Sequence, residues 1–244
     1  MALDGWVKGS FTAATLTRDT YRKGSGPVVI VVHEIPGITP AVERFANDVV
    51  NAGFTVVMPN LVGTAGREVS GKYVASSMLK VCISKEFTNM ALQKTSPIIS
   101  WLRALAKSLH AEVGGKGVGA VGMCFSGGFA LGMMVDDIMI APVLSQPSLP
   151  FNVGKGRGAD LNLSPDDALV IAQRAADGCQ VLGLRFDQDK LVGDRFNSLR
   201  ELIGDAFIAI ELPSRSPKDH SVLTEQRDEA SVQRVLDFFS EKLK

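Results

Sequence analysis

Three residues of types that cooperate in acyl-group hydrolysis are spread along the chain: Cys124, Asp189 and His220. A cysteine nucleophile needs a base, and that base needs a carboxylate to orient it. Cys124 lies where a strand-like apolar run, residues 118–123, meets an apolar stretch with the pattern of a buried helix. A strand that turns sharply into a helix with a nucleophile at its tip is a nucleophile elbow. The pattern therefore predicts Cys124 as the nucleophile.

Small residues surround Cys124, as the strained backbone of an elbow requires. Gly122 precedes it by two positions and Ser126 follows by two. Ser126 is the alternative nucleophile. The residue two positions before it would then be Cys124, whose side chain is larger than an elbow prefers at that position. Ser126 would also lie already within the first residues of the helix. A second alternative is that Cys124 is an inert buried thiol, the usual state of a free cysteine.

His220 is the expected base. The hydrolase order along the chain is nucleophile, acid, histidine, and His220 is the only histidine after Cys124. His110 falls near a predicted helix end, which suggests a structural role. His33 follows an early strand and could shape the pocket, but it precedes the nucleophile.

The acid is expected from the loop that follows the predicted strand 181–186. Asp189 lies a short step past that strand, in a loop that should approach His220. Asp187 is the alternative, although its side chain could instead cap the turn. Asp194 is expected to lie already inside the next helix.

Two glycine patterns could suggest a nucleotide site, and we interpret neither in that way. The spacing Gly117-x-Gly119-x-x-Gly122 matches a dinucleotide fingerprint, but these glycines precede and interrupt a strand instead of following one. The glycine-rich loop 147–158 has no Gly-Lys pair followed by Ser or Thr, so a solvated loop is favoured. His and Cys are not spaced as zinc ligands. We therefore expect no cofactor and no metal.

The elements that must position these residues alternate between strand and helix. Residues 11–22 suggest one or two edge strands, and residues 61–85 an irregular, polar loop with short helices over a pocket. Alternation of this kind predicts one doubly wound, mostly parallel sheet flanked by helices, in a single α/β domain over residues 1–244. Strands are expected at 28–32, 54–59, 118–123, 138–143, 181–186 and 206–212, and helices at 41–52, 86–110 with a break at Pro97, 164–178, 192–203 and 224–243.

Composition limits the partners. The 244 residues carry 26 basic and 26 acidic side chains, a formal net charge of zero, which gives no reason to expect nucleic acid or an anionic membrane. Three cysteines favour a reducing compartment over a disulfide scaffold. The N-terminal segment lacks a signal-peptide pattern, and no apolar run approaches a membrane span. We expect a cytoplasmic protein with a small-molecule substrate; its oligomeric state stays open.

Four segments, taken in order, resemble the dienelactone hydrolase family: 33–37, 122–128, 188–189 and 219–221. The resemblance covers nearly the whole chain and implies the α/β-hydrolase fold with a Cys-Asp-His triad at Cys124, Asp189 and His220. It further implies that Glu34 interacts with the cysteine and influences its ionisation. The family's oxyanion hole would correspond to the backbone N–H groups of Ile35 and Phe125.

The resemblance implies a hydrolase that cleaves an ester or lactone of a small substrate. Acyl transfer, thioester hydrolysis and non-catalytic ligand binding on the same fold stay open as alternatives. One departure concerns the substrate: Thr224 stands near the place where the type enzyme has an arginine for the substrate carboxylate. Arg67, Lys72 or Lys85 could supply a cation, although solvated surface charge is the more common state of such residues.

Glu34 has two interpretations. It follows a buried apolar strand, where nothing in the strand pattern asks for a carboxylate. It could be a turn residue that accepts hydrogen bonds from backbone amides. Alternatively it is a second carboxylate beside Cys124 that controls when the thiol ionises.

Overall fold

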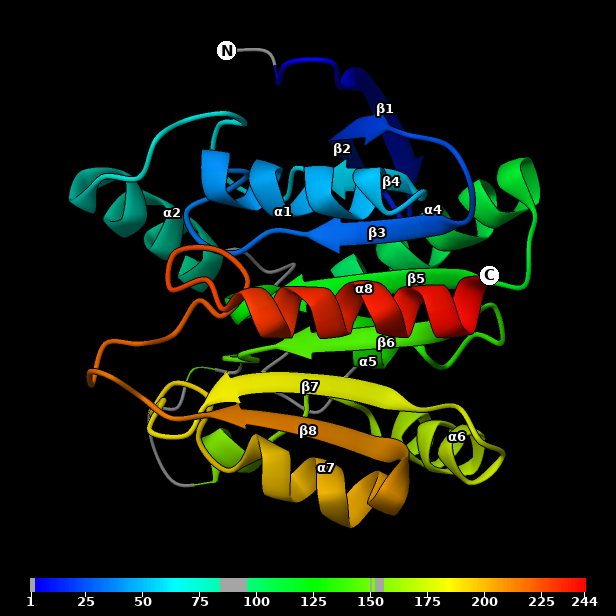
Figure 1. The fold of residues 1–244 in the computed structure, drawn as a ribbon, viewed down its shortest axis with the longest axis vertical. Coiled ribbons are helices and arrows are strands. Elements are labelled where there is room, and N and C mark those ends of the chain that lie inside the picture. Colours follow the sequence, from blue (N-terminus) through cyan, green and yellow to red (C-terminus); the bar gives the residue numbers. More distant parts are fainter. Residues whose placement is uncertain (1–2, 84–95, 150, 152–155) are drawn as a thin grey trace.

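The computed structural model describes residues 3–83, 96–149, 151 and 156–244. Eight strands form one sheet in the order β1-β2-β4-β3-β5-β6-β7-β8 (Figure 1). The strands β3 to β8 run parallel to one another, whereas β1 and β2 are antiparallel additions at one edge. The predicted doubly wound, mostly parallel sheet is thus confirmed. The strands are β1 Val7–Ala13, β2 Leu16–Lys23, β3 Val28–Val32, β4 Thr55–Pro59, β5 Val118–Met123, β6 Met139–Ser145, β7 Val181–Phe186 and β8 Phe207–Leu212.

Helices cover both faces of the sheet. In Figure 1, α1 and α8 lie in front of the sheet, and their apolar residues share one core with one face of the strands. The helices α4, α5, α6 and α7 contribute to the core on the other face. The bounds are α1 Pro40–Asn51, α2 Gly71–Ile83, α4 Pro97–Val113, α5 Phe129–Met133, α6 Pro165–Ala176, α7 Arg195–Ile203 and α8 Glu229–Leu243.

The central strands are apolar on both faces because helices bury both. All five residues of β3 and all six of β5 are buried. Such continuous apolar runs are typical of the middle of a parallel sheet. Local signals also place the helix starts. Thr39 caps α1 before Pro40, and Ser164 caps α6 before Pro165.

Two elements differ from expectation in their extent. Within the segment predicted as a loop with short helices, α2 forms a helix of 13 residues. The last helix begins at Glu229, not at residue 224, because Asp228 caps it and residues 221–228 form hydrogen-bonded turns. The first part of the helix predicted over 86–110, residues 86–95, lies outside the described residues, as do residues 150 and 152–155 of the glycine-rich loop.

The parallel strands point the same way, so the segments after β3, β5, β6, β7 and β8 leave the sheet at one end (Figure 1). In open α/β sheets this carboxyl end is where ligands bind. All the site residues predicted from sequence follow one of these strands.

Candidate active site

Cys124 occupies the tip of a sharp turn between β5 and α5. The residue has φ 56°, a left-handed conformation that is strained for a residue other than glycine. A Cβ added to Gly122 would lie 2.0 Å from the carbonyl oxygen of Ser126, so only glycine fits there. The turn therefore has the geometry expected of a nucleophile elbow, with the thiol at the end of a central strand.

Ser126 stabilises this turn. It is fully buried, and its Oγ lies 3.0 Å from each of the carbonyl oxygens of Val32, His33 and Met123, which share its proton. The same Oγ accepts the amide of Met123 at 2.9 Å. The Ser126 hydroxyl thus links the elbow to the end of β3. Because its hydrogen bonds all go to backbone groups, this geometry does not favour Ser126 as a nucleophile.

Asp189 and His220 meet across the loops after β7 and β8. The His220 Nδ1 lies 2.6 Å from the Asp189 Oδ2. The other carboxylate oxygen of Asp189 accepts the amide of Leu191 at 3.0 Å. Asp189 is buried, so its orientation is determined by these two bonds. A carboxylate on Nδ1 leaves Nε2 as the imidazole atom that can exchange a proton with a nucleophile.

The second imidazole nitrogen of His220 faces the thiol. Nε2 is buried and makes no hydrogen bond of normal geometry within the part of the chain that the structure describes. Burial opposes the charged form of His220. Hydrogen bonding to Asp189 and the proximity and charge of the Cys124 thiol outweigh burial and raise the pKa of His220 to about 10. The structure thus brings Cys124, His220 and Asp189 together in the order that a triad requires.

The two other candidate acids lie elsewhere. Asp187 is exposed and accepts the amide of Ser214 at 2.9 Å, and this hydrogen bond lowers the pKa of its carboxyl. Its side chain therefore caps the turn. Asp194 is also exposed and precedes α7 as its N-cap residue, whereas the sequence suggested a place inside the helix.

Glu34 is buried at the turn after β3 and accepts three hydrogen bonds from side chains. The Oε2 atom accepts Ser221 Oγ at 2.7 Å and Gln146 Nε2 at 3.3 Å, and Oε1 accepts the hydroxyl of Thr224. These donors are neutral. Burial raises the pKa of Glu34, and the hydroxyl donors and the positive charge of His220 act against that rise. Among the described contacts, none of its hydrogen bonds comes from Cys124.

His33, next to Glu34, is a fully buried neutral imidazole. Its Nδ1 donates to the Glu34 carbonyl oxygen at 2.7 Å, and its Nε2 accepts the amides of Leu61 and Val62 at 3.0 and 3.4 Å. Burial lowers its pKa to about 4. His33 thus fixes the segment after β4 against the turn after β3. His110 lies in the last turn of α4, away from these contacts.

The turns after β3 and β5 carry the two expected oxyanion donors. These strands are neighbours, with Val32 paired to Gly122, and the His33 and Phe125 rings lie 5.7 Å apart. Ile35 follows in the first turn, and its backbone N–H has no hydrogen-bond partner in the described part of the chain. Phe125 directly follows the thiol. The two amides therefore come from adjacent turns, as an oxyanion hole of this fold needs.

Gln146 was missed by sequence reasoning. It is fully buried at the end of β6 with φ 35°, again left-handed. Besides its bond to Glu34, its Oε1 accepts Ser145 Oγ and the amide of Val222, the latter at 3.4 Å. One feature of the sequence could have identified Gln146: it is a polar residue directly after a buried strand that neighbours the strand of the elbow.

The candidate cations lie at the surface where the structure describes them. Arg67 is exposed, with its guanidinium 4.4 Å above the ring of Tyr73. Lys72 is exposed on α2. Lys85 lies outside the described residues. Thr224, at the place of the expected arginine, is buried and bonded to Glu34.

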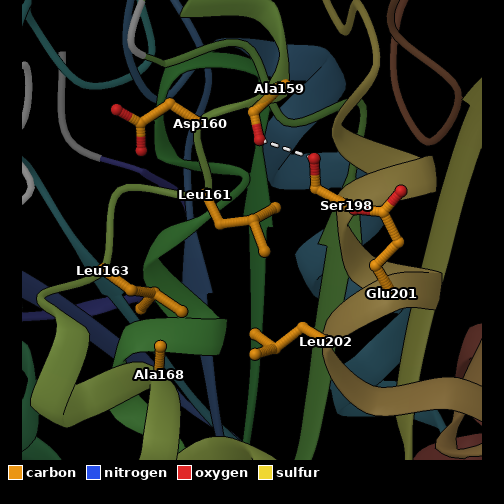
Figure 2. A pocket seen from close by; sticks show the side chains of 8 residues that line it. All are labelled: Ala159, Asp160, Leu161, Leu163, Ala168, Ser198, Glu201 and Leu202. Atoms are coloured by element: carbon orange, nitrogen blue, oxygen red, sulfur yellow. Dashed lines mark hydrogen bonds between the residues drawn. The ribbon is translucent and has the colours of Figure 1, made fainter. Parts of the chain in front are cut away.

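A separate hollow of about 400 Å³ lies between α6, α7 and residues 159–163. Figure 2 shows its leucine side chains around a shared space, with Ser198 bonded to the carbonyl oxygen of Ala159 at 2.7 Å. Its titratable groups are the carboxylates of Asp160 and Glu201. These groups offer no nucleophile–base pair, so the hollow is not a second candidate for the same chemistry.

The described residues contain no cluster of three His, Cys, Asp or Glu side chains suited to a metal ion. They also contain no helix that is both long and apolar enough to cross a bilayer.

Comparisons with known proteins address the fold and the family of the chain. Solved structures share the fold at low identity. A dienelactone hydrolase from Anabaena variabilis has a TM-score of 0.66 and 15% identity, covering 98% of both chains. A cold-adapted esterase from an Arctic intertidal metagenomic library has a TM-score of 0.60 and 16% identity, covering 97% of this chain and 93% of the other. A dienelactone hydrolase-like promiscuous phosphotriesterase from metagenomic libraries has a TM-score of 0.61 and 17% identity, covering 98% of both.

No curated protein sequence matches the chain significantly. The sequence profile of the dienelactone hydrolase family, however, matches residues 13–243. That match spans β2 to α8, and so includes every element that carries a site residue. The chain therefore belongs to the dienelactone hydrolase family.

Proposed function

We propose that this enzyme cleaves the ester or lactone bond of a small substrate through a Cys124–His220–Asp189 triad. One observation carries the proposal. Cys124 lies at the tip of an elbow with a strained backbone, near His220, whose Nδ1 lies 2.6 Å from the buried carboxylate of Asp189. Family membership supports the same chemistry.

In the proposed reaction, the Cys124 thiolate attacks the carbonyl carbon, and the carbonyl π electrons move to oxygen. The amides of Ile35 and Phe125 stabilise that oxyanion. Collapse of the intermediate breaks the bond to the leaving oxygen, which takes the proton of His220 Nε2. Water then attacks the thioester and gives its proton to the same nitrogen, and the acid product leaves with Cys124 regenerated. Asp189 holds the imidazole tautomer throughout.

The substrate is expected to be a small ester, and dienelactone itself is a less favoured candidate. Thr224 is engaged with Glu34 and offers no charge to a substrate carboxylate. Acyl transfer or thioester hydrolysis would use the same triad with a different acceptor or leaving group. The three cysteines suit a reducing compartment, so we place the reaction in the cytoplasm.

A substrate screen tests the proposal. Esters of increasing acyl length, thioesters and five-membered lactones would be compared for kcat/KM, with Cys124→Ala as the inactive reference and Ser126→Ala as the matched control at the rival position. We expect ester or lactone turnover that disappears in Cys124→Ala. Turnover that survives in Cys124→Ala and disappears in Ser126→Ala would overturn the assignment of the nucleophile.

A further inference from the structure

The carboxyl of Glu34 points toward the segment that carries the base. Two of its hydrogen bonds come from Ser221 and Thr224, and Ser221 directly follows His220 in the chain. The positive charge of His220 also opposes the rise in the pKa of Glu34. Glu34 is therefore a second carboxyl group, besides Asp189, that is hydrogen-bonded to the segment around the base.

Gln146 is the third donor to Glu34. Its Oε1 accepts the amide of Val222, which can only donate, so the amide group is oriented with Nε2 toward Glu34. The backbone of Gln146 is anchored as well, since its N–H donates to Leu184 O at 2.7 Å and its C=O accepts Ser148 Oγ at 2.8 Å. A buried polar side chain held on all sides has one conformation available.

The position of Gln146 links three parts of the site. Its side chain joins the turn of Glu34 to the loop of His220 through Val222. Its neighbour Ser148 donates its amide to the carbonyl oxygen of Cys124 at 3.0 Å. The left-handed backbone at φ 35° is a strained conformation that the surrounding bonds must maintain. Strain of this kind is concentrated at functional sites.

We propose that Gln146 is a positioning residue that holds the carboxyl of Glu34 against the segment of His220, so that Glu34 stabilises the imidazolium of His220. This inference rests on the proposed function, because it assigns a role around the same base. It adds a role for Glu34 at the base to the expectation that Glu34 influences the ionisation of Cys124.

The charged groups around the pair are few among the described residues. Asp189 and Cys124 face His220 from the loop after β7 and from the elbow. Glu225, next to Thr224, opposes the charge on Glu34. If Glu34 is replaced, or no longer held in this orientation, His220 keeps only Asp189 and the thiol as partners. Because a negative charge near the imidazolium is then lost, His220 should titrate at a lower pH.

The experiment is an NMR pH titration of His220 in the intact protein with labelled histidine, which needs no substrate. His33 and His110 are assigned with His→Gln variants. The variants are Glu34→Gln, Gln146→Met and the double variant, with Thr224→Val as a second route to the same effect and Gln173→Met as the surface control. In wild type, His220 should titrate well above the ordinary value of 6.5.

We expect the His220 midpoint to fall by about one pH unit in Glu34→Gln. It should fall by a smaller amount in Gln146→Met and Thr224→Val and stay unchanged in Gln173→Met. The double variant should equal Glu34→Gln alone, because Gln146 acts through Glu34. Thr224→Val keeps the test usable if Gln146→Met does not fold.

An unchanged His220 midpoint in Glu34→Gln would overturn the inference. So would additive shifts in the double variant, which would mean that Gln146 acts without Glu34. A pH profile of Cys124 alkylation that moves while His220 does not would assign Glu34 to the thiol. If the midpoints shift as expected and no ester or lactone is turned over, the proposed function fails and the coupling of Glu34 to His220 stands.

Discussion

Two histidines at the carboxyl end of the sheet have opposite electrostatic environments. His33, after β3, is fully buried and contacts backbone carbonyl and amide groups, and burial lowers its pKa to about 4. His220, after β8, is largely buried, but Asp189 and Cys124 outweigh the effect of burial and raise its pKa to about 10. Burial alone therefore does not identify a base. A carboxylate on one ring nitrogen and a reactive group near the other distinguish the candidate base from a structural histidine.

Replacing each histidine with glutamine is the strongest way to break this comparison. His220→Gln should lower kcat/KM by about 10⁴-fold or more, because the nucleophile loses its only described base. His33→Gln keeps an acceptor for the Leu61 amide and should stay within about tenfold of wild type. Initial rates on the best ester of the screen measure both. Comparable losses in the two variants would remove the distinction.

The carboxylate that distinguishes the two histidines is tested next. Asp189→Asn should reduce kcat by about 10³-fold, because an amide cannot hold the correct imidazole tautomer. Asp187→Asn, two residues away, should change kcat little, because Asp187 is bonded to the backbone of Ser214. Steady-state kinetics at a pH where both variants are folded would decide. A larger loss in Asp187→Asn would exchange the two roles.

The two histidines also predict opposite pH windows of stability. In the unfolded chain His33 binds a proton near pH 6.5, whereas in the folded protein it does so only near 4. Stability should therefore fall by about 3 kcal/mol as the pH drops from 6.5 to 4. The contribution of His220 has the opposite sign: it is present below 6.5 and is lost as the pH rises toward 10.

Urea unfolding at a series of pH values measures these windows. The acid-side loss should shrink in His33→Gln, and the alkaline-side loss should shrink in His220→Gln. An acid-side slope that is the same in His33→Gln and wild type would show that other groups, such as paired carboxylates, cause it.

The smallest effect concerns thiol reactivity. Cys124 should react with iodoacetamide at least about tenfold faster than Cys179, whose pKa is raised by burial. His220→Gln should slow the labelling of Cys124, and His33→Gln should not. Peptide mapping after brief alkylation near pH 7 gives each rate, including that of Cys82. Equal labelling of Cys124 and Cys179 would count against an activated thiol.

The sequence predicts the sheet and much of the site, and particular residues show why. The run from Val28 to Val32 can only be a strand buried on both faces, and chain order leaves His220 as the single histidine after the nucleophile. Such signals are local or depend on order. The distance from Asp189 to His220, by contrast, is a property of two loops that the sequence does not place.

The environment of Glu34 could not be predicted in this way. Its three donors come from Gln146, Ser221 and Thr224, which follow two different strands. Neither their spacing nor their residue types mark them as partners of a carboxyl group. The extent of the helix α2 could not be predicted for another reason: its glycine start and serine-rich middle are weak helix formers, and the packing of Tyr73 and Val81 stabilises the helix.

Ser126 has a consequence for how this scaffold can change over time. The atoms that maintain the left-handed turn belong to residue 126 and to the ends of two strands, and none belongs to the thiol. The residue proposed to carry the chemistry, Cys124, and the residue that maintains the turn, Ser126, are thus close in sequence but separate. A single nucleotide change that exchanges sulfur for oxygen at position 124 would leave the turn intact, so a lineage could explore new nucleophiles without first rebuilding its fold.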